Sequence, residues 1–193
     1  MPGPTVGLGH ERNQGTLLDV MKRLLLTLLM LPCVSASAQV SGFTQAVLDR
    51  DGEVLWLRRA DGSQTAAPTL EDQDSFEAPA VASDRRHAGW LALFPNQGAS
   101  YSQPLYLVVM DTSNHLQRFR SDFGMVFKWC FTPRGKEVVF QSAFPHGPTP
   151  AEFEMRRISD GRLLRRFTLP ENTLRGDGDT PHEPVPSWAN CTR

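Results

Sequence analysis

The sequence predicts an all-β protein built from repeated antiparallel meanders, and three observations indicate this fold class. Apolar residues recur mainly with a period of two, which is the spacing of a strand with one buried face. The 15 glycines and 15 prolines of the 193-residue chain suit many turns between short strands. Asp-Gly pairs follow apolar runs at Asp51-Gly52 and Asp61-Gly62, and such pairs favour hairpins because type I′ turns need positive φ.

In chain order, the first two strands are expected at 43–48 and 54–57, on either side of the first Asp-Gly turn. Eight further short runs follow, at 78–82, 88–94, 105–111, 115–120, 125–131, 137–144, 152–158 and 162–168. After residue 38, no segment shows the spacing of about 3.6 residues that predicts an amphipathic helix. Ten short strands without a convincing helix therefore favour an all-β domain.

The strand pattern repeats along the chain. Residues 82–90 align with residues 132–140, and Phe94-Pro95 aligns with Phe144-Pro145, at an offset of 50. Each unit is predicted to be a four-stranded antiparallel meander, and residues 43–59 to be half of another. The sequence therefore predicts two to three meander units.

Two to three meander units are too few to close a β-propeller, so the exposed faces and edges of their sheets must be covered in another way. A closed β-propeller has typically about four to eight blades, and unpaired strand edges recruit other chains. Face-to-face packing, assembly with other copies, or a tail over one end would each provide cover. We expect a compact two-layer monomer in preference to an oligomer, with the Pro-rich tail 169–193 packed on the domain through Val185 and Trp188.

Residues 132–140 resemble the Ser-Pro-Asp-Gly-Lys hairpin of TolB-type β-propeller repeats. With residues 89–96 and 158–164, the region 40–168 is also similar to small secreted bacterial proteins of unassigned activity. The resemblance implies incomplete propeller-like repeats and transfers no functional residues. The first unit departs from the pattern at residues 84–86, which lack the turn glycine, so we expect its hairpin to differ.

Residues 21–38 have the three parts of a secretory signal peptide. Lys22 and Arg23 form the basic region, residues 24–34 form a mostly apolar core, and small residues precede Gln39. The core is shorter than the roughly 20 residues of a membrane span, so we expect no transmembrane segment in the mature chain. The protein is expected to be periplasmic or secreted, with a β-repeat domain over 39–168. Residues 1–20 indicate an upstream extension or a misassigned start site.

Charge and cysteine content narrow the function classes. A net charge of −1 argues against the basic surface that nucleic-acid binding needs, so no nucleic-acid partner is expected. Cys130 and Cys191 form an even pair in an oxidising compartment, and we expect them to form a disulfide worth about 4 kcal/mol in the loop-entropy model. Two free thiols are the alternative.

The motifs of common enzyme classes are missing from the sequence. It contains no Gly-x-Ser-x-Gly elbow, no phosphate-binding loop and no dinucleotide glycine pattern. The histidines after residue 38 include no i, i+4 pair, and no cysteine cluster is present. We therefore expect no metal and no cofactor.

Long loops follow the two Phe-Pro pairs, at 96–104 and 146–151, and equivalent loops of a repeated scaffold project from one side. The candidate ligand-binding residues in and beside them are Asn96, Tyr101, His146 and Glu152. They provide amide, phenol, imidazole and carboxylate groups, and His146 facing Glu152 could transfer protons. In the alternative interpretation these residues only form turns, pack and bond within the loops.

The leading hypothesis is an exported, non-catalytic β-repeat protein that binds an envelope protein or a small ligand through these loops. One alternative is a hydrolase or lyase whose carboxylates come from several loops and work with His146. A second alternative is a purely structural envelope component.

Two further patterns favour ordinary structural roles. Arginines at 156, 157, 162, 165 and 166 suggest an anionic partner, but a solvated hairpin with neighbouring glutamates is the expected reading. Phe127, Trp129 and Phe131 alternate along one strand and are expected to pack between sheets. A carbohydrate-stacking platform would require them to be exposed.

Overall fold

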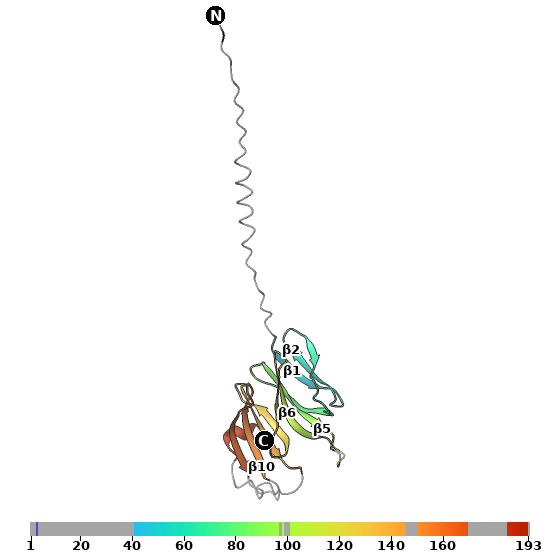
Figure 1. Cartoon of the computed structure of the whole chain (residues 1–193), viewed down its shortest axis with the longest axis vertical. Helices are drawn as coiled ribbons and strands as arrows, with labels where there is room; N and C mark the ends of the chain where they lie inside the picture. Colours follow the sequence, from blue (N-terminus) through green and yellow to red (C-terminus); the bar gives the residue numbers. More distant parts are fainter. Residues whose placement is uncertain are drawn as a thin grey trace. The chain divides into compact units, whose positions relative to one another are not determined.

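The structure, a computed structural model, describes residues 3, 41–96, 98, 101–145, 150–169 and 185–192. The chain divides into two units, Met1–Gln39 and Val40–Arg193, and the second contains the described strands (Figure 1). The expected extension and signal peptide lie, apart from Gly3, outside the described residues. Within the described part, no helix is long and apolar enough to cross a membrane.

The described residues form three antiparallel sheets in which consecutive strands are neighbours, which confirms the all-β meander fold. The first sheet contains β1 (Phe43–Leu48), β2 (Leu55–Arg59) and β3 (Gln64–Ala66). The second contains β4 (Ser75–Val81), β5 (His87–Phe94), β6 (Gln103–Asp111) and β7 (Leu116–Phe119). The third contains β8 (Met125–Phe131), β9 (Glu137–Ala143), β10 (Ala151–Arg157) and β11 (Leu163–Leu169).

The second sheet is buried on both faces. Trp90 of β5 and Val108 of β6 face a core shared with the first sheet, whereas Leu91 and Leu107, one residue along each strand, face a core shared with the third. The stack therefore has three layers, and our expectation of two layers is wrong. The reason is that β5 and β6 are apolar on both faces, so a single neighbouring sheet leaves one face uncovered.

The free face of the third sheet is covered by the C-terminal segment. Val185 and Trp188 pack against a cluster that includes Val139 and Phe153, and the short 3-10 helix η2 (Ser187–Thr192) lies on β8 and β9. Residues 170–184 of the expected tail are outside the described part. The side chain of Cys191 also lies outside the described part, so the disulfide between Cys130 and Cys191 stays a prediction.

The aligned turns of the second and third sheets contact each other. Ser83 Oγ donates a hydrogen bond of 2.6 Å to the carbonyl of Pro133, its counterpart in the repeat. Gly135 has a φ of 66° and lies so close to Asp84 that an added Cβ would be 2.7 Å from Asp84 Cγ. A side chain at this position would therefore strain both the backbone and the contact between the sheets.

The turn of the first unit has the same shape as that of the second, so our expectation of a different hairpin is wrong. Arg85, at the place of Gly135, has a φ of 58°. Its N–H donates to the Ala82 carbonyl at 2.9 Å, as Gly135 N–H does to the Thr132 carbonyl at 2.8 Å. The strand pairing on either side imposes the left-handed conformation even without glycine.

The aromatic strand β8 also departs from its expected pattern. Trp129 and Phe131 pack against the core between the second and third sheets, and the Trp129 indole donates to the Ala78 carbonyl at 3.0 Å. Phe127 is 42% exposed, because the register shifts between Val126 and Lys128 and interrupts the alternation. The expected core position of Phe127 is therefore wrong.

Candidate functional site

One pocket lies between the second and third sheets, at the end of the strands where the two Phe-Pro pairs occur. In an up-and-down meander, the β5–β6, β7–β8 and β9–β10 connections all lie at the same end of the strands. The loop-end pocket, of about 640 Å³, is lined by Gln103, Leu105, Arg120, Ser121, Asp122, Gly124, Met125, Phe144 and Pro145. Gln103 begins β6 within the predicted loop 96–104, and Phe144 and Pro145 immediately precede the predicted loop 146–151.

One glycine holds the β7–β8 connection against the neighbouring strand. Gly124 has a φ of 96°, and an added Cβ would lie 2.5 Å from the carbonyl oxygen of Ala143 in β9. Only glycine allows this approach without a backbone shift. The close contact places residues 120–122 beside the start of the second Phe-Pro loop.

The loop-end pocket combines apolar walls with two opposite charges. Leu105, Met125 and Phe144 are its large apolar side chains, and the Phe144 ring meets that of Phe123 edge-on at 5.2 Å. Phe144 is nevertheless 49% exposed, an unusual position for a large aromatic ring. Arg120 and Asp122 are exposed, and only Ser121 separates them in the sequence. Such a site suits a ligand with one bulky apolar group and both a donor and an acceptor.

A buried hydroxyl pair lies at the wall of the pocket, where Ser121 lines it. Ser142 Oγ of β9 donates to Ser121 Oγ at 2.7 Å, and Ser121 Oγ also accepts from the Phe123 N–H at 3.0 Å. Both serines are fully or nearly fully buried. They tie the connection that carries Arg120 and Asp122 to the third sheet, so the pocket wall is held in place by buried hydrogen bonds.

A buried acidic pair extends this polar layer along β10. Glu154 is fully buried and accepts hydrogen bonds from Arg156 Nε and, at 2.9 Å, from an Arg166 terminal nitrogen. Glu152 is 8% exposed and pairs across the strands with Ser142. Its Oε1 lies 3.5 Å from Arg166 Nε and has no hydrogen bond within the described residues.

The two carboxylates differ in their surroundings. Burial, and then the neighbouring Glu154, raise the pKa of Glu152 above its usual range, while Arg166 opposes the shift. The hydrogen bond to Glu154 raises the pKa of Arg166. Asp122, on the pocket wall, adds to the upward shift of Glu152.

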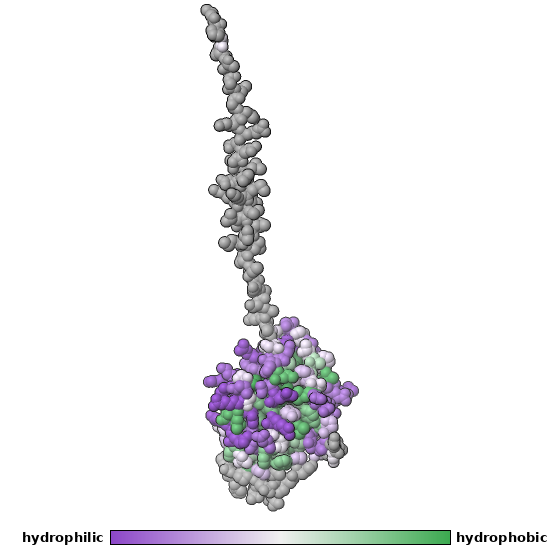
Figure 2. Space-filling model, in the orientation of Figure 1, coloured by the Kyte–Doolittle hydropathy of each residue, from purple (hydrophilic) through white to green (hydrophobic). Residues whose placement is uncertain are grey.

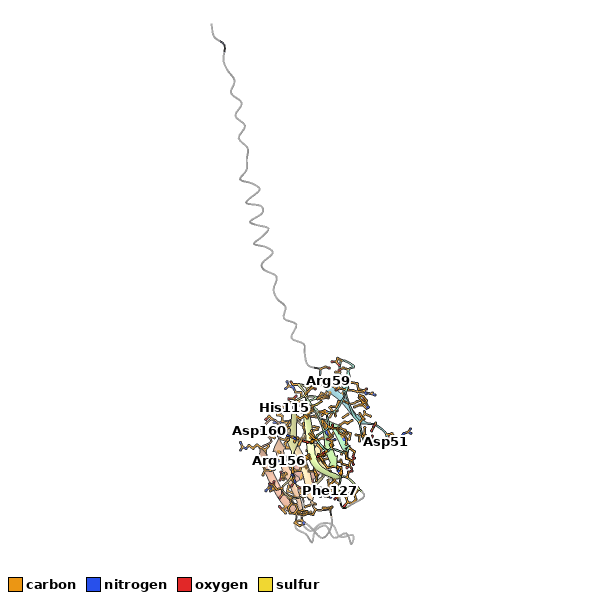
Figure 3. All side chains as sticks on the ribbon, turned by 45° about the vertical axis from the view of Figure 1, so that its right-hand side comes forward. Asp51, Arg59, His115, Phe127, Arg156 and Asp160 are labelled. Carbon is orange, nitrogen blue, oxygen red and sulfur yellow. The ribbon has the colours of Figure 1, made fainter. Side chains whose placement is uncertain are left out.

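The arginine run is only partly a solvated hairpin. Glu154 forms ion pairs with the half-buried Arg156 and with the exposed Arg166, whereas Arg157 forms an exposed pair with Asp160 at 3.0 Å. Figure 3 shows Arg156 and Asp160 on the same side of the domain, with Phe127 toward the other end.

Three of the four residues predicted to bind ligand are among the described residues, and each has a different setting. Asn96 is half-buried, and its Oδ1 accepts from the Gly98 N–H at 3.3 Å, which stabilises a turn. Tyr101 is 43% exposed within the first loop. His146 lies outside the described residues. Glu152 is in the layer behind the loop-end pocket.

The repeat did not predict a role for the β7–β8 connection, which provides Arg120, Ser121 and Asp122. This connection joins one unit to the next and has no equivalent loop within a unit. The order of the strands could have indicated this connection. Alternate connections of a meander lie at the same end of the strands, so the β7–β8 connection lies at the same end as β5–β6 and β9–β10.

Comparison with family models gives no match, and comparison with curated proteins gives none either. Among solved structures, the acylaminoacyl peptidase of Pyrococcus horikoshii matches with a TM-score of 0.42 and 9% identity. The match covers 67% of this chain and 25% of that chain, so this chain spans about a quarter of the peptidase's length. At this level the likeness says nothing about activity.

Proposed function

We propose that this protein is an exported recognition module that binds a segment of an envelope protein, or a small ligand, in the loop-end pocket. The observation that carries the proposal is the pocket itself, to which Gln103, the Phe144-Pro145 pair and the β7–β8 connection contribute. Binding residues are commonly found on loops held by a rigid β scaffold. The signal-like segment at 21–38 and the predicted Cys130–Cys191 disulfide support export.

The chemistry of the lining favours a peptide segment with a bulky apolar side chain. Leu105, Met125 and Phe144 offer an apolar surface to that side chain. Arg120 can donate to a peptide carbonyl, and Asp122 can accept from a peptide N–H. Because Ser121 and Ser142 fix the connection that bears both charges, little ordering entropy is lost on binding.

One observation favours a second candidate, a hydrolase or lyase. Glu152 is a buried carboxyl with a raised pKa close to Asp122, and such groups occur at catalytic sites. Its position behind Ser121 and Ser142 keeps it one layer away from the pocket surface. This candidate predicts turnover that disappears in Glu152→Gln while pocket binding persists.

Site-specific photocrosslinking tests the proposal. A photoreactive phenylalanine analogue replaces Phe144 or, as a matched control, Trp56, which is 38% exposed on β2 of the first sheet. The full chain is produced in a bacterial host with an envelope. Crosslinks to a partner are expected from position 144 and not from position 56, and they should weaken when Asp122→Asn is added.

Two outcomes would count against the proposal. Equal labelling from both positions would indicate non-specific encounter. Crosslinks only between copies of this chain would instead favour the structural envelope component.

A further inference from the structure

A second cavity lies at the opposite end of β9 from the loop-end pocket. This turn-end cavity, of about 200 Å³, is lined by His87, Lys136, Glu137, Arg157, Ile158 and Ser159. It lies where the β8–β9 and β10–β11 turns meet the start of β5, and the Ile158 N–H donates to the Lys136 carbonyl at 3.0 Å. Backbone bonding therefore holds two of its walls together.

The turns around this cavity are rich in cations, although the whole chain is slightly acidic. Residues 83–87, 133–137 and 157–162 form three turns of the second and third sheets. They contain six cationic residues, namely Arg85, Arg86, Arg134, Lys136, Arg157 and Arg162, and three acidic ones, namely Asp84, Glu137 and Asp160. These three turns therefore carry a formal net charge of about +3, although the whole chain has −1. Purple, hydrophilic residues cover much of the face shown in Figure 2.

Each of the three carboxylates already has partners of its own. Asp84 Oδ1 accepts from the Arg86 N–H at 2.8 Å, and Glu137 Oε2 accepts from Thr132 Oγ1 at 2.7 Å. Asp160 accepts from Arg157 at 3.0 Å and from the Arg162 N–H at 3.1 Å. Several oxygens of these three carboxylates therefore already accept hydrogen bonds from neighbouring groups of the same turns.

The donors that line the cavity are in excess. Within the described residues, no hydrogen bond or ion pair involves the Lys136 ammonium group. His87 Nδ1 is buried without a hydrogen bond, and its nearest acid is Asp84 at 3.4 Å. Arg157 uses one terminal nitrogen for Asp160, which leaves further guanidinium donors, and Ser159 adds a hydroxyl.

We propose that the turn-end cavity binds a phosphate-type oxyanion through Lys136, Arg157 and His87. An ammonium, a guanidinium and an imidazole on three different turns or strands match the several acceptor oxygens of such a group. The group can belong to a soluble phosphate or to an anionic lipid headgroup. The site is independent of the loop-end pocket.

The experiment titrates the full protein with inorganic phosphate at constant ionic strength, which is maintained with chloride so that screening does not change. The backbone N–H resonances of Gly135 and Ile158 report binding by NMR. Lys136→Gln removes one proposed ligand, and Arg134→Gln removes an exposed cation of the same turn that does not line the cavity. In parallel, sedimentation compares phosphatidylglycerol vesicles with phosphatidylcholine vesicles.

Phosphate is expected to shift both resonances, with affinity at least about tenfold lower in Lys136→Gln and within about twofold of the parent in Arg134→Gln. Binding to phosphatidylglycerol alone, with the same dependence on Lys136, would identify a lipid headgroup as the source of the oxyanion. Equal losses in the two variants would overturn the proposal in favour of a diffuse basic surface. The absence of binding in both arms would also overturn it.

Discussion

Introducing glycine in the first of the two aligned turns and removing it from the second should have opposite effects on stability. Arg85 and Gly135 occupy the same place in the repeat and share a left-handed backbone, with φ of 58° and 66°. Arg85→Gly should therefore stabilise the fold, and Gly135→Ala should destabilise it. The comparison tests whether the sheet pairing imposes this conformation on both turns.

The magnitudes follow from the local geometry. Holding a non-glycine residue in the left-handed region costs roughly 1–2 kcal/mol, and glycine costs roughly 0.5–1 kcal/mol in unfolded-state entropy. Arg85→Gly should thus raise the free energy of unfolding by about 0.5–1 kcal/mol. Gly135→Ala reverses these terms and adds a contact of 2.7 Å with Asp84 Cγ. Displacing Asp84 endangers its hydrogen bond to the Arg86 N–H, so the total cost should reach about 2 kcal/mol.

Urea denaturation of the purified protein, followed by tryptophan fluorescence, measures both variants. An Asp84→Ala background provides the control, because it removes the atoms that the new Cβ would meet. Gly135→Ala should cost less there, and the difference gives the coupling between the two turns. A neutral Gly135→Ala or a destabilising Arg85→Gly would show that the turns are not equivalent.

Three other predictions concern buried contacts. Because the pKa of Glu152 is raised in the folded protein, its contribution to stability is complete below the usual Glu pKa of about 4.3 and is lost as pH rises through the raised value. Glu152→Gln should flatten this decline in urea titrations across pH, and an unchanged profile would contradict the shift. Glu154→Gln should cost about 1.5–3 kcal/mol because it weakens charged hydrogen bonds to Arg156 and Arg166 at a fully buried position, whereas Asp160→Asn, in an exposed pair, should cost under about 1 kcal/mol. Similar costs of the two substitutions in urea denaturation would argue against a stabilising ion-pair network around Glu154. Gly89→Ala places a Cβ 2.7 Å from the Trp129 ring and should cost about 1–3 kcal/mol, with partial recovery in a Trp129→Leu background; no recovery would mean that another contact is responsible.

The repeat and its strands could be predicted because they depend on local chemistry. Two-residue apolar alternation and Asp-Gly turns predict hairpins without reference to distant residues. The same repeat indicated that the two Phe-Pro pairs lie at one end of the strands, and Phe144 and Pro145 of the second pair line the loop-end pocket. Of the candidate residues described, Glu152 lies behind this pocket, whereas Asn96 serves a turn.

The rest of the candidate site depends on neighbours that the alternation pattern does not identify. The presence of Arg120 and Asp122 in the pocket follows from the approach of Gly124 to Ala143, a contact between separate strands. The bulge that exposes Phe127 likewise depends on the register of β8 against β9.

The local pattern of apolar and turn residues was sufficient to indicate strands, hairpins and a duplicated unit. The number of layers and the burial of Glu152 and Glu154 required the packed structure. The physical reason is that alternation states which residues share a face of a sheet, whereas burial and charge pairing depend on what lies against that face.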